Sequence, residues 1–295
     1  MKIVNASFEE IALNHPYKMI ERVGRVCYKS ENLIKDGSDI IFTKKILSFN
    51  HGSVLEHAYL VFEVLDKELF YRLESLHPHF LTFTNESRLL MSGNFRAFYE
   101  LYLHFNNKDY YPLYAYLENI FKEVYPSNYK EYYQDNLFYK LTKKDILSLS
   151  EEEKDVHLSL TILFITDRGV SHELVRHRLA SYAQESTRYC NYAKDKFAHE
   201  ISFIKPLGLT SNQEEIWKKA MEEAERSYFA LLENGAKAEV ARSVLPNSLK
   251  TEIVCTCVLK EWKHIFMLRT DTKAHPDIRY IMNETKNYFK ERGYL

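Results

Sequence analysis

The most constraining stretch of this sequence is the polar segment 171–192, because its charges follow neither a helical nor a strand period. Arg176, His177 and Arg178 stand in a row, and Ser186 follows after seven intervening residues. Successive side chains of an α-helix point about 100° apart, so a helix would separate the three basic groups. We therefore expect a loop or a sharp helix end, where all three side chains can converge on one anion. Arginine suits this role because its planar fork of donors matches phosphate and carboxylate oxygens.

Length and charge restrict the partners of the chain. The 295 residues are enough for one large domain or two small ones, and 45% hydrophobic with 27% charged residues is typical of a soluble globular protein. The formal net charge is −1. No overall attraction to nucleic acid or to a membrane follows from that charge, so an anion site must be local. We expect neither nucleic acid nor membrane among the partners.

The cysteines and glycines exclude several kinds of site. Cys27, Cys190, Cys255 and Cys257 form no Cys-x-x-Cys pair, so neither a disulfide scaffold nor a metal site is expected, and a reducing cytoplasm fits. The chain opens without an apolar signal run, and no stretch approaches 18 apolar residues. The eight glycines form no Gly-x-Gly-x-x-Gly loop. A nucleotide cofactor, if one binds, does not use that phosphate-binding device.

The apolar periodicity predicts alternating helices and strands. Ser171 is expected to cap a helix that ends near Arg178, after a turn at 167–169. A turn is also expected at 50–52, and Gly235 is expected to close a long amphipathic helix with apolar positions at 216, 220, 224, 228 and 231. The predicted strands are 1–6, 59–64, 80–84, 156–166 and 251–259, and the predicted helices are 16–28, 39–48, 212–234, 260–269 and 276–289.

Four separated motifs resemble the flavin-dependent thymidylate synthases. The first is the signature Arg-His-Arg, seven residues, then Ser, here from Arg176 to Ser186, with the usual Arg188-Tyr189 after it. The others are the His-x-Ser-x-x-Glu-His segment 51–57, the Val-Ala-Arg-x-x-Leu-Pro segment 240–246, and the arginine at 269. For the histidines of 51–57, turn capping and core hydrogen bonding remain an alternative to ligand contact.

The resemblance implies an α/β (α+β) fold, a mixed or antiparallel sheet flanked by helices, and one domain over residues 1–295. In the compact family pattern the strand after the first motif leads quickly to the signature, but here His57 and Arg176 lie 119 positions apart. We therefore expect an insertion at about 66–150. It is rich in tyrosine, with 11 of the 22 tyrosines between Tyr99 and Tyr139, which favours a core or partner-facing helix set over a nucleic-acid platform. The resemblance also implies a homotetramer with active sites between subunits.

The implied reaction is the reductive methylation of dUMP to dTMP, with 5,10-methylenetetrahydrofolate and NADPH as co-substrates and FAD as the cofactor. The cofactor carries the hydride chemistry, and the protein supplies orientation and electrostatics. No cysteine nucleophile is expected, since Cys255 and Cys257 lie in an apolar strand and Cys190 has no evident partner. The alternative is a flavin oxidoreductase that binds a uridine nucleotide without methylating it. That alternative is motivated by Gln184, where the family often has Glu, and by the change at Val258.

The resemblance assigns roles to individual residues. Arg269 is the catalytic residue, which polarises the uracil ring, with a helix-terminal cation as its structural alternative. Glu173 is expected to meet a ribose hydroxyl or an arginine, since an acid beside a phosphate is unfavourable. The flavin-binding residues are expected to be His51, Ser53, Asn94, Arg96, Arg176, His177, Arg178, Gln184 and His264. The dUMP-binding residues are expected to be Glu173, Arg176, Gln184, Glu185, Ser186, Thr187, Arg188, Arg242 and Arg269.

One departure from the family pattern leads to a hypothesis. The family commonly carries Asn-x-Arg where this chain has Val258-Leu259-Lys260, and valine cannot hydrogen-bond FAD. The segment 92–98, Ser-Gly-Asn-Phe-Arg-Ala-Phe, reads like the Gly-Asn-x-Arg-Ala-aromatic form of the same element. We predict that Asn94 and Arg96 supply the flavin contacts that are lost at 258–260.

Overall fold

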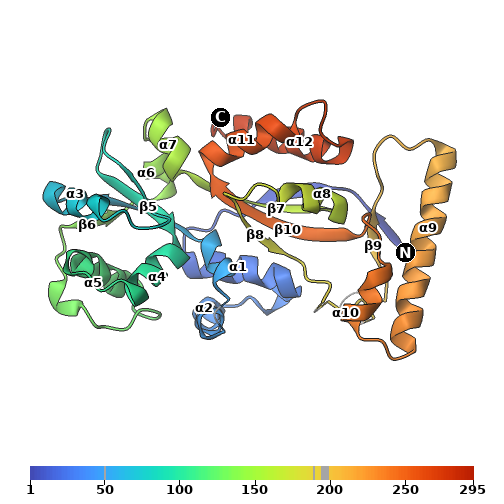
Figure 1. Cartoon of the computed structure of the whole chain (residues 1–295), viewed down its shortest axis with the longest axis horizontal. Helices are drawn as coiled ribbons and strands as arrows, with labels where there is room; N and C mark the ends of the chain where they lie inside the picture. The colour runs from blue at the N-terminus through green and yellow to red at the C-terminus, as the bar shows by residue number, and fades with distance from the viewer. Residues whose placement is uncertain (50, 189, 194–198) are drawn as a thin grey trace.

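A computed structural model describes residues 1–49, 51–188, 190–193 and 199–295 of the chain. Its centre is a four-stranded antiparallel sheet in the order β2-β7-β10-β8, with helices on both faces (Figure 1). The expected fold class, antiparallel sheet flanked by helices, is therefore confirmed. The strands of this sheet are β2 (Ser7–Glu10), β7 (Ser159–Asp167), β8 (Ser181–Gln184) and β10 (Lys250–Val258).

The two faces of the central sheet pack against different helices because side chains alternate along each strand. On β10, Val254 faces the core that includes α1, whereas Ile253 and Cys255 face the core that includes Trp262 and Met282. In Figure 1, α1 and α2 cover one face, and α8, α11 and α12 cover the other. These helices are α1 (Pro16–Tyr28), α2 (Ser38–Ser48), α8 (Arg168–Leu174), α11 (Leu259–Arg269) and α12 (Pro276–Glu291).

A second antiparallel sheet, in the order β4-β5-β3-β6, carries an aromatic helical layer. Tyr102, Tyr110, Tyr114 and Tyr125 are buried there, so much of the tyrosine-rich segment is core. The same apolar cluster also contains Val254 of the central sheet. The elements are β3 (Tyr59–Val64), α3 (Lys67–Ser75), β4 (Thr82–Thr84), β5 (Leu90–Asn94), α4 (Phe95–His104), α5 (Tyr111–Ile120), β6 (Phe138–Lys140), α6 (Lys143–Leu147) and α7 (Glu151–His157).

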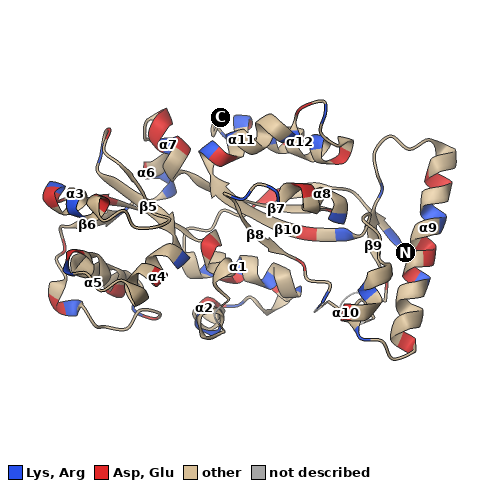
Figure 2. Cartoon of the chain, viewed as in Figure 1, with Lys and Arg blue, Asp and Glu red and all other residues tan. Residues whose placement is uncertain are grey.

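A third, smaller unit lies beside the central sheet. Strands β1 (Lys2–Val4) and β9 (Ser202–Ile204) pair in parallel, and the long helix α9 (Ser211–Glu233) and α10 (Ala238–Ala241) pack next to them (Figure 1). Charges of both signs follow one another along α9 (Figure 2). The 3₁₀ helices of the described chain are η1 (Glu31–Leu33), η2 (Gly52–His57), η3 (Lys108–Tyr110), η4 (Lys130–Tyr132) and η6 (Arg242–Val244).

One buried carboxylate ties distant parts of the chain together. Glu10 at the end of β2 accepts hydrogen bonds from Lys143 Nζ (2.5 Å), Tyr288 OH (2.8 Å) and Tyr294 OH (3.1 Å). Burial by itself raises the pKa of Glu10, but Lys143 and the two hydroxyl groups outweigh it, so the net shift is downward. The ionised Glu10 thus joins α6 to the helix that ends the fold.

Several local predictions are wrong. Residues 156–157 end helix α7 instead of starting a strand, because Ser150 and Glu153 form a capping box that begins a helix at Glu151. Ser171 is not an N-cap: Asp167 caps α8 by accepting from Val170 N at 2.7 Å, and the helix ends at Leu174. Ile216 of the expected apolar stripe is exposed. The expected turn at 50–52 begins at Asn50, which lies outside the described residues. Within the described part of the chain, no helix has the length and apolar character needed to cross a membrane.

Candidate functional site

The signature segment forms the connection between α8 and β8. After α8 ends, the chain turns at 175–180 and then enters β8, which pairs antiparallel with β10. The predicted loop is confirmed, but the predicted convergence of its three basic side chains is not. His177 is 5% exposed, whereas Arg176 and Arg178 are both exposed. His177 instead turns inward, toward the end of α11.

Arg269 is the centre of the contacts made by this loop. As the last residue of α11, it reaches Glu173 through Nη1 to Oε2 (3.0 Å) and Nη2 to the backbone oxygen (2.8 Å). Its Nε donates to His177 Nε2 at 3.0 Å. Glu173 therefore meets an arginine, which is one of the two contacts expected for it. The guanidinium is held by three hydrogen bonds across more than 90 positions of sequence.

These contacts fix the protonation state of His177. Because Arg269 can only donate, Nε2 of His177 must carry the lone pair, and the remaining proton sits on Nδ1. Burial, together with the nearby Arg269 and His264, lowers the pKa of His177 to about 4. The side chain is thus a neutral imidazole at neutral pH.

His264 and Glu261 of α11 lie on the other side of the His177 ring. The two imidazole ring centroids are 5.9 Å apart, and Nδ1 of His177 is 3.8 Å from Glu261 Oε1. The three side chains are close enough to hold a metal ion. The tautomer argues against a metal, however, since Nδ1 carries the proton and offers no lone pair on that side. His264 is exposed next to this ring and remains available to a ligand.

Gln184 at the end of β8 is fixed by two hydroxyl groups. Its Nε2 donates to Ser171 Oγ (2.9 Å) and to Thr251 Oγ1 (3.1 Å). These partners come from α8 and β10, so the amide joins the signature loop to the central sheet. An amide at this position can orient a ligand but cannot take up a proton as a carboxylate would.

Two arginines meet the segment that follows β8. Arg242 Nη1 donates to Thr187 Oγ1 at 3.2 Å, and Arg168 Nη2 donates to the backbone oxygen of Glu185 at 2.8 Å. Neither arginine pairs with a carboxylate within the described residues, and the buried Nε of Arg168 has no hydrogen-bond partner there. Burial lowers the pKa of Arg168, and the nearby Arg242 adds to this effect. Two neighbouring cations with spare donors next to Ser186 are chemically suited to an anion.

Sequence reasoning missed Arg168. An arginine directly after a strand was interpreted as part of a turn. The available signal was its position at the start of α8, eight residues before the signature. Arg188, in contrast, lies near Glu239 of α10, at 3.4 Å between Nε and Oε2. Tyr189, which follows Arg188 in the motif, lies outside the described residues.

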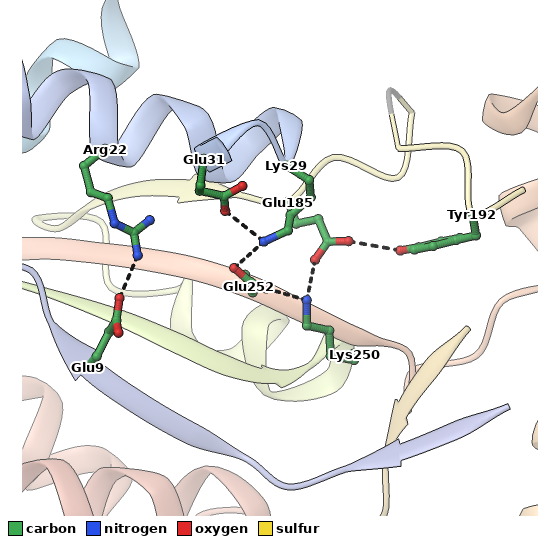
Figure 3. Close-up of polar contacts among 8 residues, drawn as sticks. All are labelled: Glu9, Arg22, Lys29, Glu31, Glu185, Tyr192, Lys250 and Glu252. Carbon is green, nitrogen blue, oxygen red and sulfur yellow. Dashed lines mark hydrogen bonds and ion pairs between the residues drawn. The ribbon is translucent and has the colours of Figure 1, made fainter. Parts of the chain in front are cut away.

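A buried network of acids and lysines supports this segment from behind (Figure 3). Glu185 is only 2% exposed, and Lys250 Nζ lies 3.0 Å from its Oε2 and 2.6 Å from Glu252 Oε1. Glu252 also pairs with Lys29 at 2.8 Å, and Tyr192 OH donates to Glu185 Oε1 at 3.3 Å. Glu185 was expected to bind dUMP, but its carboxylate is occupied by the protein. The network fixes the backbone from which Ser186 and Thr187 project.

Arg96 lies against the η2 segment. Its Nη1 donates to Glu56 Oε1 at 2.8 Å, and the other oxygen of Glu56 accepts from Ser181 Oγ at 2.8 Å. A Cβ added to Gly52 would lie 2.8 Å from Arg96 Nε, so a larger residue there would displace this guanidinium. His51 and Ser53, which flank Gly52, are both exposed. Arg96 is thus placed between η2 and β8.

Asn94 and His57 make contacts within the protein. Asn94 Oδ1 caps α4 by accepting from Ala97 N at 2.8 Å. His57 is 1% exposed, and its Nδ1 lies 2.7 Å from Thr256 Oγ1. Burial lowers the pKa of His57 to about 4. The core alternative therefore holds for His57.

The cysteines are poorly suited to act as nucleophiles. Cys190, Cys255 and Cys257 are buried, and burial raises the pKa of Cys257 far above its usual value. Burial also raises the pKa of Cys27 to about 11. At neutral pH, Cys27 and Cys257 therefore stay protonated.

Known proteins match the part of the chain that contains the signature segment and Arg269. The family described as "Thymidylate synthase complementing protein" matches residues 128–292, more than half of the chain. A flavin-dependent thymidylate synthase of Geobacter sulfurreducens is 35% identical over 158 residues, which cover 51% of this chain and 67% of that protein. The enzyme of the same name from Pyrococcus abyssi is 40% identical over 116 residues, 39% of this chain and 47% of that protein. This chain thus matches about half the length of the Pyrococcus relative.

A solved structure with a similar arrangement is the UMP/dUMP methylase PolB from Streptomyces cacaoi, bound with 5-Br dUMP. The alignment covers 99% of this chain and 93% of that chain, with 16% identity and a TM-score of 0.43.

Proposed function

This chain belongs to the family of thymidylate synthase complementing proteins, and from that premise we propose that it methylates dUMP to dTMP with the help of a bound flavin. The observation that carries the proposal is the contact of Arg269 with both Glu173 and His177. This contact places Arg269, the last of the four motifs, against the signature loop. A nucleotide bound there would meet one guanidinium at its base and others at its phosphate.

The phosphate of dUMP would be held by groups around the end of β8. Arg242 and Arg168 offer charged donors, Thr187 offers a hydroxyl group, and Ser186 follows directly on the buried Glu185. Arg188 would close this site by leaving Glu239. Charge-assisted hydrogen bonds to phosphate are roughly twice as strong as neutral ones, so several of them can position a dianion firmly.

Arg269 would act on the uracil ring. A guanidinium beside the N3 and O2 edge stabilises negative charge that develops on the ring during methylation and reduction. Glu173 and His177 hold this guanidinium in place before the substrate arrives, so little reorganisation is needed. The neutral His177 can keep accepting the Nε proton of Arg269 without adding a second positive charge.

The exposed residues fit a flavin nucleotide. Arg176 and Arg178 are exposed and form no ion pair within the described residues, and His51, Ser53 and His264 are exposed as well. They can take the pyrophosphate and ring edges of FAD, with Gln184 between flavin and substrate. Reduced flavin supplies a hydride when bound. The high thiol pKa of Cys257 and Cys27 supports a route without a sulfur nucleophile.

We also infer that the site is completed by further copies of the chain in a homotetramer. Apolar side chains surround the signature loop: Leu179 is 82% exposed and Met267 on α11 is 62% exposed. Val175 and Leu268 are exposed beside them. Large exposed apolar groups around a polar site are typical of subunit contacts.

The direct test measures tritium release from [5-³H]dUMP by the purified protein. We expect a yellow protein that releases tritium and forms dTMP only when methylenetetrahydrofolate and NADPH are both present. We also expect its gene to support growth of a thymidine-requiring bacterium. Oxidation of NADPH with bound dUMP but without dTMP would show the flavin oxidoreductase instead. A colourless protein that binds no flavin would contradict both functions.

The proposed flavin role of Arg96 gives a separate prediction. Arg96→Ala should weaken FAD binding at least tenfold, because one charge-assisted hydrogen bond contributes about 1.5–3 kcal/mol. The measurement is the flavin-to-protein ratio by absorbance after gel filtration. The matched control is Arg72→Ala. Arg72 on α3 pairs with the carboxylates of Glu68 and Asp109, and Arg96 is likewise paired with carboxylates. Unchanged FAD content in Arg96→Ala would refute the hypothesis.

A further inference from the structure

A cavity of about 260 Å³ lies where the insertion meets the central sheet. Its walls come from the 10–16 loop, the end of η2, the start of β7, and the segment 140–146 of the insertion. Arg168, one of the proposed phosphate contacts, follows the other end of β7, roughly 20 Å or more from Leu160 along the strand. None of the residues proposed to bind dUMP lines the cavity.

Most polar groups of this cavity are already satisfied. Glu10 accepts from Lys143 and two tyrosines, so it offers no free charge. His157 uses Nδ1 toward Ser92 Oγ (2.7 Å) and Nε2 toward Thr84 Oγ1 (2.8 Å). Burial lowers the pKa of His157 to about 4, as it does for His57, which also lines the cavity. Both histidines are neutral at neutral pH.

Lys140 is different, because it is a cation without a counter-ion. Within the described residues, no carboxylate pairs with its Nζ. This atom makes a cation–π contact with the ring of Phe121, at 5.5 Å from the ring centroid. Burial lowers the pKa of Lys140, which shows that the charged form is costly there. An anion in the cavity would relieve that cost.

Part of the remaining wall is apolar. Ile11, Met19, Val61, Ile146 and Leu160 line it. A water molecule occupies about 30 Å³ in the liquid, so the cavity has room for about eight waters or one small organic molecule. Drug-sized ligands need about 300–1,000 Å³, so this volume suits a small organic molecule better than a nucleotide or a flavin.

We propose that this cavity binds a small monocarboxylate, with its carboxylate on Lys140 and its apolar body against Ile11, Met19 and Leu160. Because Lys140 has no counter-ion among the described residues, the cavity favours a ligand with one negative charge. The apolar lining residues favour a ligand whose remaining part is a compact hydrocarbon or aromatic group. The site is built jointly by the insertion and the central sheet. Its existence does not depend on the proposed dUMP methylation.

Calorimetric titration of the full-length protein with benzoate tests the site. We expect benzoate to bind, benzamide to bind at least tenfold more weakly, and Lys140→Met to lower the benzoate affinity at least tenfold. Lys144→Met is the matched control, since Lys144 is exposed, lies four residues further on and does not line the cavity. Its affinity for benzoate should equal that of the wild type.

Two further measurements keep the test decisive if a variant is damaged. Lys140→Met should melt no lower than the wild type, because it removes a desolvated charge and keeps the aliphatic stem. A crystal soaked with 4-bromobenzoate should show the anomalous signal of bromine inside the cavity. Absence of benzoate binding, equal binding by Lys140→Met, or a bromine signal only at another site would each overturn the proposal.

Discussion

Replacing Arg269 by alanine should lower the rate of dTMP formation about a thousandfold while dUMP still binds. The phosphate contacts near Arg242 and Arg168 are untouched by this change, so most of the binding energy of the nucleotide remains. What is lost is a preorganised guanidinium at the place where charge develops on the ring, and one such donor typically contributes a factor of about 10²–10³. Removal of the full charge brings the expected loss to the upper end of that range.

The measurement is single-turnover dTMP formation at saturating dUMP, with the flavin content and melting temperature recorded for each variant. Arg269→Lys keeps a charge but loses the fork that spans Glu173 and His177, so it should recover only part of the rate. Arg279→Ala is the control, since Arg279 on the neighbouring helix also bonds a backbone oxygen but lies outside the site. A loss of less than tenfold in a folded, flavin-loaded Arg269→Ala would remove this arginine from the chemistry.

Acid should unfold the protein in a window set by three buried histidines. Burial lowers the pKa of His57, His157 and His177 to about 4 each. In the unfolded chain they have the ordinary value near 6.5, so between pH 6.5 and 4 the unfolded state binds the additional protons. The free energy of unfolding then falls as the pH falls. Each histidine contributes about 1.4 kcal/mol per pH unit, and the three together contribute about 4 kcal/mol per pH unit.

Urea unfolding between pH 7.5 and 5 checks this slope. Asp167 and Glu261, whose pKa values are raised by burial, oppose this trend as the solution becomes more acidic, so the range stops at pH 5. His157→Gln should remove about one third of the slope. His104→Gln, at an exposed position on α4, should leave it unchanged. A free energy of unfolding that is flat from pH 7 to 5 would show that these histidines are not held neutral.

Local sequence patterns predicted those helices and strands whose ends are marked by the residues at the ends themselves. Helix α1 begins at Pro16, a residue favoured in the first turn, and its apolar spacing gives the rest. Strand β3 also follows the prediction from Tyr59 to Val64. The predicted start of β7 was wrong although the sequence contained a signal against it. Ser150 and Glu153 match the pattern of a capping box, which begins a helix.

The site was less accessible to sequence reasoning because its contacts join distant segments. The motifs named Arg269 and Glu173, but their direct contact depends on where the end of α11 meets α8. Glu185 was expected to meet the substrate, yet Lys250 and Tyr192 occupy it, and neither belongs to the signature. Arg168 escaped notice because a lone arginine after a strand has no pattern of its own.

The hydrogen bonds of Glu10 have a consequence for how the chain unfolds. They fasten the edge of the central sheet, the insertion and the C-terminal helix to one carboxylate, and the aromatic layer shares its apolar cluster with Val254. The two sheets thus share part of their apolar packing. We therefore expect the tyrosine-rich segment to melt together with the central sheet in one cooperative transition, rather than as a separable module.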